Sequence, residues 1–186
     1  MASVVDICNK ALDKLGHKPI MSLDDGTKGA SLCKRNWSFI RDEVLRDGAW
    51  NFATVRKTTA PDTETPSWGF SYQHSLPTNC LKLIQVLDLS VNEFRVEGRK
   101  ILANDDVLYI RYIKSETDPN QYDSMFINAV STRLAIELCE SLTQSTTKRQ
   151  ELSADYDRFI TSTRLQDALE NPPDDFEDDT WLASRY

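Results

Sequence analysis

The sequence predicts an α+β fold, namely a discontinuous four-helix bundle with an inserted small antiparallel β domain and an extended C-terminal arm. Apolar residues recur at three- and four-residue steps near both ends of the chain, as in amphipathic helices, while the middle alternates apolar and polar residues as strands do. No proline falls inside a predicted helix. The predicted domains are residues 1–57 and 119–170 for the helical bundle, 58–118 for the inserted β domain and 171–186 for the arm.

Two helices are predicted before the β domain. The first covers residues 4–15 and is followed by Gly16, at the position of a left-handed C-terminal cap. The second begins at a cap provided by Thr27 or Asp25 and ends at Gly48. Its apolar stripe consists of Cys33, Trp37, Ile40 and Val44.

The loop between these helices contains glycines, a lysine and two adjacent aspartates. A phosphate-binding loop has its lysine after the second glycine and follows a strand, but here Lys28 precedes Gly29 and a helix precedes the loop. A calcium loop has oxygen ligands at alternate positions, but Asp24 and Asp25 are neighbours. The loop is therefore predicted to be a helix stop, a turn and a helix start.

The middle of the chain is predicted to form antiparallel β-strands. Residues 58–66 form a polar linker flanked by prolines, and about four to six short strands are expected over residues 68–113. The strongest local signals are a hairpin centred on Gly98 and a turn at Asn104-Asp105 before a strand of aromatic and β-branched residues.

Two further helices are predicted after Pro119, from Tyr122 onward and over about residues 147–169. The short loops within each helix pair predict antiparallel helical hairpins. The two stripes are Phe126, Val130, Leu134, Leu138 and Ser141 in the third helix, and Leu152, Tyr156, Phe159 or Ile160, and Thr163 in the fourth.

Charge and cysteine usage limit the function classes. The net charge is −7, of which residues 171–186 hold −4. No basic stripe is visible, so tight nucleic-acid binding is not expected. The cysteines lack metal-ligand spacing and are expected to be reduced thiols in the core, which indicates synthesis in the cytoplasm. They are Cys8, Cys33, Cys80 and Cys139. The chain is expected to have no secretion signal, no membrane span and no membrane partner.

No catalytic, cofactor-binding or metal-binding motif is recognisable, so the chain is expected not to be an enzyme and to have no cofactor. Neither His17 nor His74 has sequence neighbours that suggest a triad or a metal site. The aromatic residues that surround the start of the β domain suggest either a stacking platform for single-stranded nucleic acid or packing in a core or domain junction, and the shortage of nearby cations favours packing. They are Trp50, Phe52, Trp68, Phe70 and Tyr72.

Several motifs in order resemble those of the tail tubular protein A family, the head-to-tail adaptors of short-tailed, podovirus-like phages. They are a short helix ending in "LGHKP", then "SLDDG", a helix containing "LCKR", the "WNFA" motif of residues 50–53, and "YQHSLPTNCL". Together they cover about a third of the chain, and the order of helices, β insertion, helices and tail fits the remainder.

The resemblance implies a non-catalytic structural protein of the virion tail, assembled in the cytoplasm of the host bacterium. Its partners would be identical subunits in a ring, expected to be a dodecamer, the twelvefold portal protein above it, and the tail nozzle protein and tail fibres below it. DNA would pass through the lumen without specific binding, and the mildly acidic composition suits that role because like charges repel. The alternatives are a small non-catalytic binding module that uses the β insertion, and an enzyme whose His17 or His74 meets a carboxylate or thiol in a cleft.

The arm is the predicted partner-binding site. Pro172-Pro173 ends the last helix, and the following residues combine five acids with large apolar side chains that have no core of their own. They form either a solubilising acidic end or an arm that orders on the portal, its aromatics anchoring in grooves and its carboxylates meeting basic residues. The residues of this hypothesis are Asp174, Asp175, Phe176, Glu177, Asp178, Asp179, Trp181, Leu182 and Tyr186.

Overall fold

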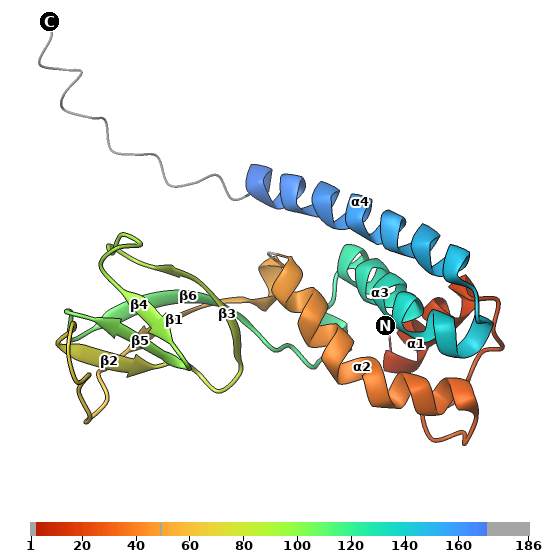
Figure 1. Ribbon diagram of the computed structural model, residues 1–186, viewed down its shortest axis with the longest axis horizontal. Helices are drawn as coiled ribbons and strands as arrows, with labels where there is room; N and C mark the ends of the chain where they lie inside the picture. Colours follow the sequence, from red (N-terminus) through yellow and green to blue (C-terminus); the bar gives the residue numbers. More distant parts are fainter. Residues whose placement is uncertain (1–2, 49, 171–186) are drawn as a thin grey trace, which may run out of the picture.

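The chain has a mixed α+β fold in which the helices and the strands gather at opposite ends of the molecule (Figure 1). The computed structural model describes residues 3–48 and 50–170. The α-helices in these residues are α1 (Val4–Lys14), α2 (Lys28–Asp47), α3 (Ser124–Thr143) and α4 (Thr146–Glu170). The strands are β1 (Thr54–Thr59), β2 (Tyr72–Ser75), β3 (Cys80–Val86), β4 (Arg95–Glu97), β5 (Lys100–Ala103) and β6 (Leu108–Lys114), with short 3-10 helices η1 (Asn51–Ala53) and η2 (Pro119–Gln121).

The helix ends follow from their capping residues. The Thr27 side chain accepts a hydrogen bond from the Ala30 amide at 3.2 Å, so Thr27 caps α2 and Asp25 does not. Gly16 has a φ of +66° just after α1, which confirms the predicted left-handed position. The Asp123 side chain accepts from the Phe126 amide at 2.6 Å and starts α3.

The loop between α1 and α2 is a turn held by its own side chains. Both polar atoms of the Asn9 amide bond the backbone of Ile20, at 2.8 and 2.9 Å. Asp25 accepts from the Met21 amide, and Asp24 pairs with Lys34 of α2 at 2.6 Å. Because both aspartates have local partners, the prediction of a helix stop, a turn and a helix start is confirmed.

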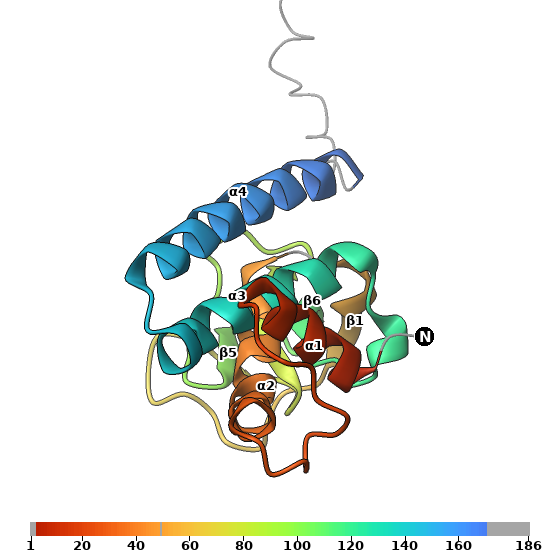
Figure 2. The same ribbon diagram turned by 90° about the vertical axis from the view of Figure 1, so that its right-hand side faces the viewer.

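One hydrophobic core draws side chains from all four helices. It is built around α3, which contacts each of the other three helices, with α4 crossing over it (Figure 2). Both predicted stripes of α2 and α3 are buried there, although the α3 stripe ends at Leu138 because Ser141 is exposed. For α4 the predicted stripe contained either Phe159 or Ile160. In the structure Ile160 is buried and Phe159 is partly buried. All four cysteines are buried and free, as predicted.

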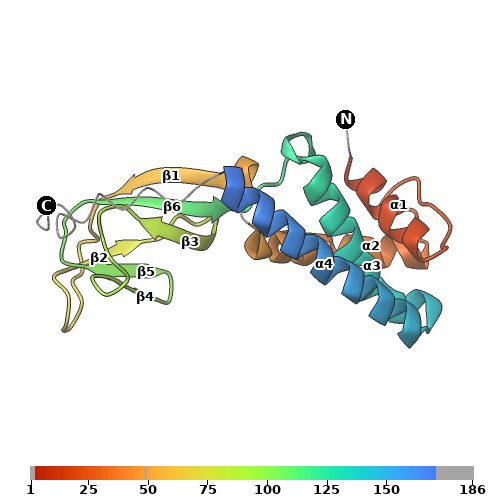
Figure 3. The same cartoon turned by 90° about the horizontal axis from the view of Figure 1, so that it is seen from above.

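The β region consists of two three-stranded antiparallel sheets, ordered β1-β6-β3 and β2-β5-β4 (Figure 3). A second hydrophobic core lies between them. Alternate residues of β6 point into this core, as a half-buried strand requires. Its buried members are Cys80, Val86, Ile101, Ala103, Leu108, Ile110 and Tyr112.

The sequence prediction is right about the hairpin at Gly98 and wrong about the start of the β region. Gly98 has a φ of +58° between β4 and β5. The strand expected from Trp68 begins only at Tyr72, since the residues before it bend. β1 occupies residues that were assigned to the helical part and to the linker. Its middle residues are exposed, so the alternating burial that identifies a strand is absent from its sequence.

Candidate partner-binding surfaces

The nine arm residues that the sequence nominates for partner binding lie outside the described residues. The arm follows Glu170, the last residue of α4. The surfaces that the structure does describe lie at the junction between the helices and the β region, on exposed apolar side chains, and on one face of the β1-β6-β3 sheet.

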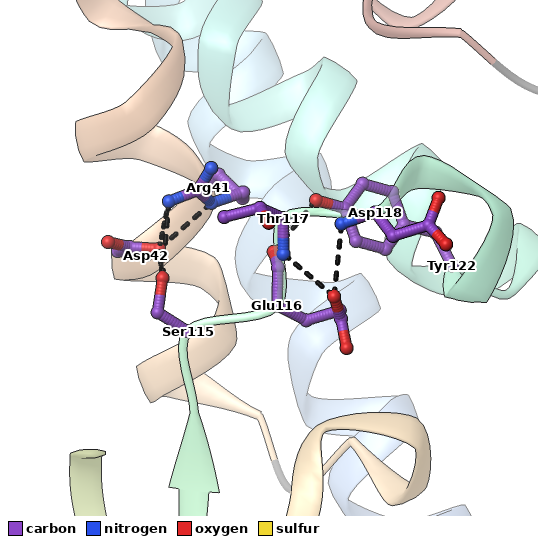
Figure 4. A network of polar contacts seen from close by, with 7 residues as sticks. All are labelled: Arg41, Asp42, Ser115, Glu116, Thr117, Asp118 and Tyr122. Atoms are coloured by element: carbon purple, nitrogen blue, oxygen red, sulfur yellow. Dashed lines mark hydrogen bonds and ion pairs between the residues drawn. The ribbon is translucent and has the colours of Figure 1, made fainter. Parts of the chain in front are cut away.

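A polar network fixes the junction where β6 returns to the helices (Figure 4). Arg41 of α2 is 9% exposed and pairs with Asp42 at 2.8 Å. Arg41 Nη2 also donates to the hydroxyl of Ser115 at 3.2 Å, and that hydroxyl donates to the Asp42 carboxylate at 2.9 Å. Residues 115–123, which join β6 to α3, are called the connector. Since a buried charge needs a full set of partners, this network holds the connector in one position against α2.

The next residue of the connector, Glu116, organises the turn that leads into α3 (Figure 4). Its Oε1 accepts from the amides of Thr117 and Asp118 at 2.9 and 3.0 Å. Its Oε2 pairs with Lys114. Burial opposes the ionisation of Glu116, but the hydrogen bond and charge of Lys114 and the two amides outweigh it and lower its pKa. Ionised Glu116 is therefore part of the folded junction.

Replacing Glu116 by Gln is expected to lower the free energy of unfolding at neutral pH by about 1–2 kcal/mol, since hydrogen bonds to a charged group are lost. Because the folded pKa is depressed, this stability is present above the unfolded pKa and disappears as the pH falls through the lower pKa of the folded state. Chemical denaturation at several pH values should show that the free energies of unfolding of wild type and variant become equal at acidic pH. Glu64→Gln, at a side chain that is 85% exposed, is the matched control. A constant difference at every pH would contradict the assignment.

The two histidines lie apart from one another. His74 on β2 is fully buried, and its Nε2 donates to the carbonyl of Asp105 at 3.0 Å. Its Nδ1 is buried without a hydrogen-bond partner in the described part of the chain. His17 lies in the loop after α1, with its Nδ1 3.1 Å from the carbonyl of Lys18. Neither histidine is paired with a carboxylate or a thiol in the contacts of the described residues.

The aromatic residues around the start of the β domain separate into two environments. Trp50 is 3% exposed, and Trp50 and Phe52 both pack on Phe126 with ring centroids 5.1 Å apart. This confirms core packing for these two. Trp68, in contrast, is 85% exposed, so the packing prediction is wrong there. The loop before β2 carries Trp68 outside both cores, because the strand that would have turned it inward does not form.

Other large apolar side chains are exposed on both ends of the molecule. On the helical part they include Phe39, on the side of α2 away from the core. Single exposed side chains of this size also occur on monomeric proteins, so each of them is only a candidate for contact with another molecule. The most exposed are Met21 at 90%, Phe39 at 74%, Trp68 at 85% and Val91 at 79%.

Sequence reasoning missed a cationic surface on the outer face of the β1-β6-β3 sheet. Strand register places Arg56 of β1 directly opposite Arg111 of β6, with Gln85 of β3 on its other side. We call this surface the basic sheet face. It comprises Arg56, Lys82, Gln85, Leu87, Tyr109 and Arg111.

In residues 3–48 and 50–170, no group of three histidine, cysteine, aspartate or glutamate side chains is placed to hold a metal ion. Likewise, none of the described helices is long and apolar enough to cross a membrane. Comparison with family models gives no match. A search of curated proteins also gives no match.

Proposed function

We propose that this chain is a structural subunit of a phage head-to-tail adaptor. In this proposal identical subunits form a closed ring beneath the portal, contact the tail nozzle below, and leave a lumen through which DNA passes. The helices form a discontinuous four-helix bundle into which the β region is inserted. The ordered motifs that resemble the tail tubular protein A family support this role, and the acidic net charge of −7 is compatible with passing DNA.

The observation that carries the proposal is the exposure of large apolar side chains on two different parts of the molecule. A ring is built from heterologous contacts, in which one patch of a subunit meets a different patch of its neighbour. Phe39 on α2 and Trp68 before β2 are candidate contact points for two such patches, since they are 74% and 85% exposed and belong to separate regions. A self-complementary dimer would need only one patch.

The rigid junction supports the same role. An adaptor transmits contact from the portal to the nozzle, so its two parts must keep a fixed relation. The Arg41, Asp42 and Ser115 network holds the β6 connector against α2. A second contact joins α2 to the β region, since Arg46 of α2 donates to the carbonyl of Leu81 on β3 at 2.6 Å.

The test is a native mass measurement of the purified chain with and without the portal protein of the same phage. The expected result is a portal complex that contains a ring of adaptor subunits. Deleting residues 174–186 should leave the subunit folded but abolish docking to portal-bearing heads, because the predicted anchoring aromatics are gone. A full-length chain that stays monomeric beside assembled portal contradicts the adaptor role and favours a binding module. A truncated chain that still completes infectious particles would rule out the arm as the anchor.

A further inference from the structure

The basic sheet face brings together cations that have no anionic partner. Like charges directly opposite on neighbouring strands repel each other, and Arg56 faces Arg111 in this way. Lys82 lies in the next row of the same face, opposite Ile113. In the described part of the chain, the side chains of these three cations have no ion pair or hydrogen bond. A sheet that keeps such a pair uncompensated is suited to an anionic ligand.

The same face is hollowed and partly apolar. A depression of about 440 Å³ is lined by residues of all three strands, and no carboxylate lines it. Arg111 Nε is buried without a partner, so one edge of its guanidinium is already desolvated. Tyr109 and Leu87 on this face are 54% and 48% exposed. The surface therefore fits a segment that carries both carboxylates and large apolar side chains.

The chain contains one segment with this composition. Residues 174–179 hold five acids around Phe176, and Trp181 and Leu182 follow. The segment leaves from Glu170, and α4 runs back over the helices so that its last turn points toward the β region (Figures 1 and 3). An extended chain advances about 3.3 Å per residue, so residue 179 is within about 30 Å of the end of α4.

We propose that residues 174–182 of each chain dock on the basic sheet face of the same chain. Carboxylates of the acidic run pair with Arg56 and Arg111, which have the planar donor geometry for this purpose. The aromatic side chains of the segment pack on Tyr109 and Leu87. Attachment to α4 keeps the segment at a high effective concentration near the face, which favours its own copy over a neighbouring one. The adaptor role is not needed for this inference, because it concerns the free subunit.

The experiment is zero-length carbodiimide coupling of the full-length chain, which joins an amine to a carboxylate with loss of water. Lys82 is the amine of the basic sheet face. The expected product links Lys82 to one of the acids of residues 174–179, and it should decrease at high salt because screening weakens the pairing. Coupling a mixture of isotopically heavy and light chains identifies the source. Products with both peptides from one chain support the proposal, and mixed products overturn it in favour of a neighbouring copy.

Charge variants give the second readout. Arg56→Glu, on an exposed edge-strand residue, should reduce the yield of the Lys82 product about tenfold, a change that corresponds to about 1.4 kcal/mol of binding. Arg56→Lys keeps the charge and should retain the product. The matched control is Arg35→Glu, at an exposed arginine of α2, which should have no effect. Equal crosslink yields in all variants would overturn the proposal. It would also be overturned if the full-length chain bound a DNA oligonucleotide through the basic sheet face and gave no crosslink between Lys82 and residues 174–179.

Discussion

Replacing Phe126 by Ala is expected to lower the free energy of unfolding by about 4 kcal/mol, the typical cost of truncating a fully buried phenylalanine. Phe126 is fully buried in α3 and lies at the centre of an aromatic cluster. Its ring packs edge-on against Trp50, Phe52 and Tyr122, at centroid distances of 5.1, 5.1 and 4.8 Å. These partners enter the core from the junction segments, so a cavity at Phe126 loosens both the helical core and the attachment of the β region.

Thermal and chemical denaturation measure this effect. For a domain of this size the loss corresponds to a fall of about 10 °C in melting temperature. Phe39→Ala is the matched control, because the same substitution is made on α2 at a side chain that is 74% exposed. The control should melt within about 1 °C of wild type, since a surface change of this kind alters stability by less than about 0.5 kcal/mol. Equal melting temperatures for the Phe126 variant and wild type would disprove the central position of this ring.

The helices could be predicted because their signals are local. An apolar stripe such as Cys33, Trp37, Ile40 and Val44 specifies both the helix and the face it buries, and Thr27 and Gly48 mark its ends. The arrangement of the helices was harder to predict, because it depends on which stripes pack together. In the structure α3 is the helix that contacts the other three, and its stripe from Phe126 to Leu138 is buried.

The β region was predicted less well, for two physical reasons. β1 is an edge strand whose middle residues Arg56, Lys57 and Thr58 are exposed, so it lacks the alternation of a half-buried strand. Trp68 and Phe70 do alternate with small residues, but the bend around Gly69, with its φ of +86°, keeps them out of β2. For β1, pairing with the distant strand β6 decided the outcome, and the local pattern of residues 54–59 does not reveal that pairing.

The basic sheet face was missed for the same reason. Arg56 and Arg111 are far apart in the sequence, and only the antiparallel register of β1 and β6 makes them neighbours. The absence of a basic run in the sequence therefore did not exclude a local cationic surface. A useful signal would have been the alternation of Tyr109 and Arg111 with buried residues in β6, because it shows that both point away from the core.

The residues that carry the resemblance include several with clear structural roles. Trp50, the first residue of the "WNFA" motif, is 3% exposed, and its indole N–H donates to the carbonyl of Val44 at 2.8 Å. Two residues earlier, Gly48 ends α2 with a φ of −103°, which any residue can adopt. The requirement for glycine is therefore steric. A Cβ added at Gly48 would lie 2.4 Å from Nε1 and 2.6 Å from Cε2 of Trp50.

The Gly48→Ala variant is accordingly expected to lose about 3 kcal/mol of stability, because overpacking a rigid site costs this much when the neighbour cannot move. Gly98→Ala is a control that introduces backbone strain without a steric clash. Gly98 has a φ of +58° and open space around it, so its substitution should cost only about 1 kcal/mol. In a Trp50→Leu background the clashing ring is absent, and the added cost of Gly48→Ala should fall below about 1 kcal/mol. Denaturation of the four variants of this cycle measures the coupling, and additive losses would show that Gly48 is not there to make room for Trp50.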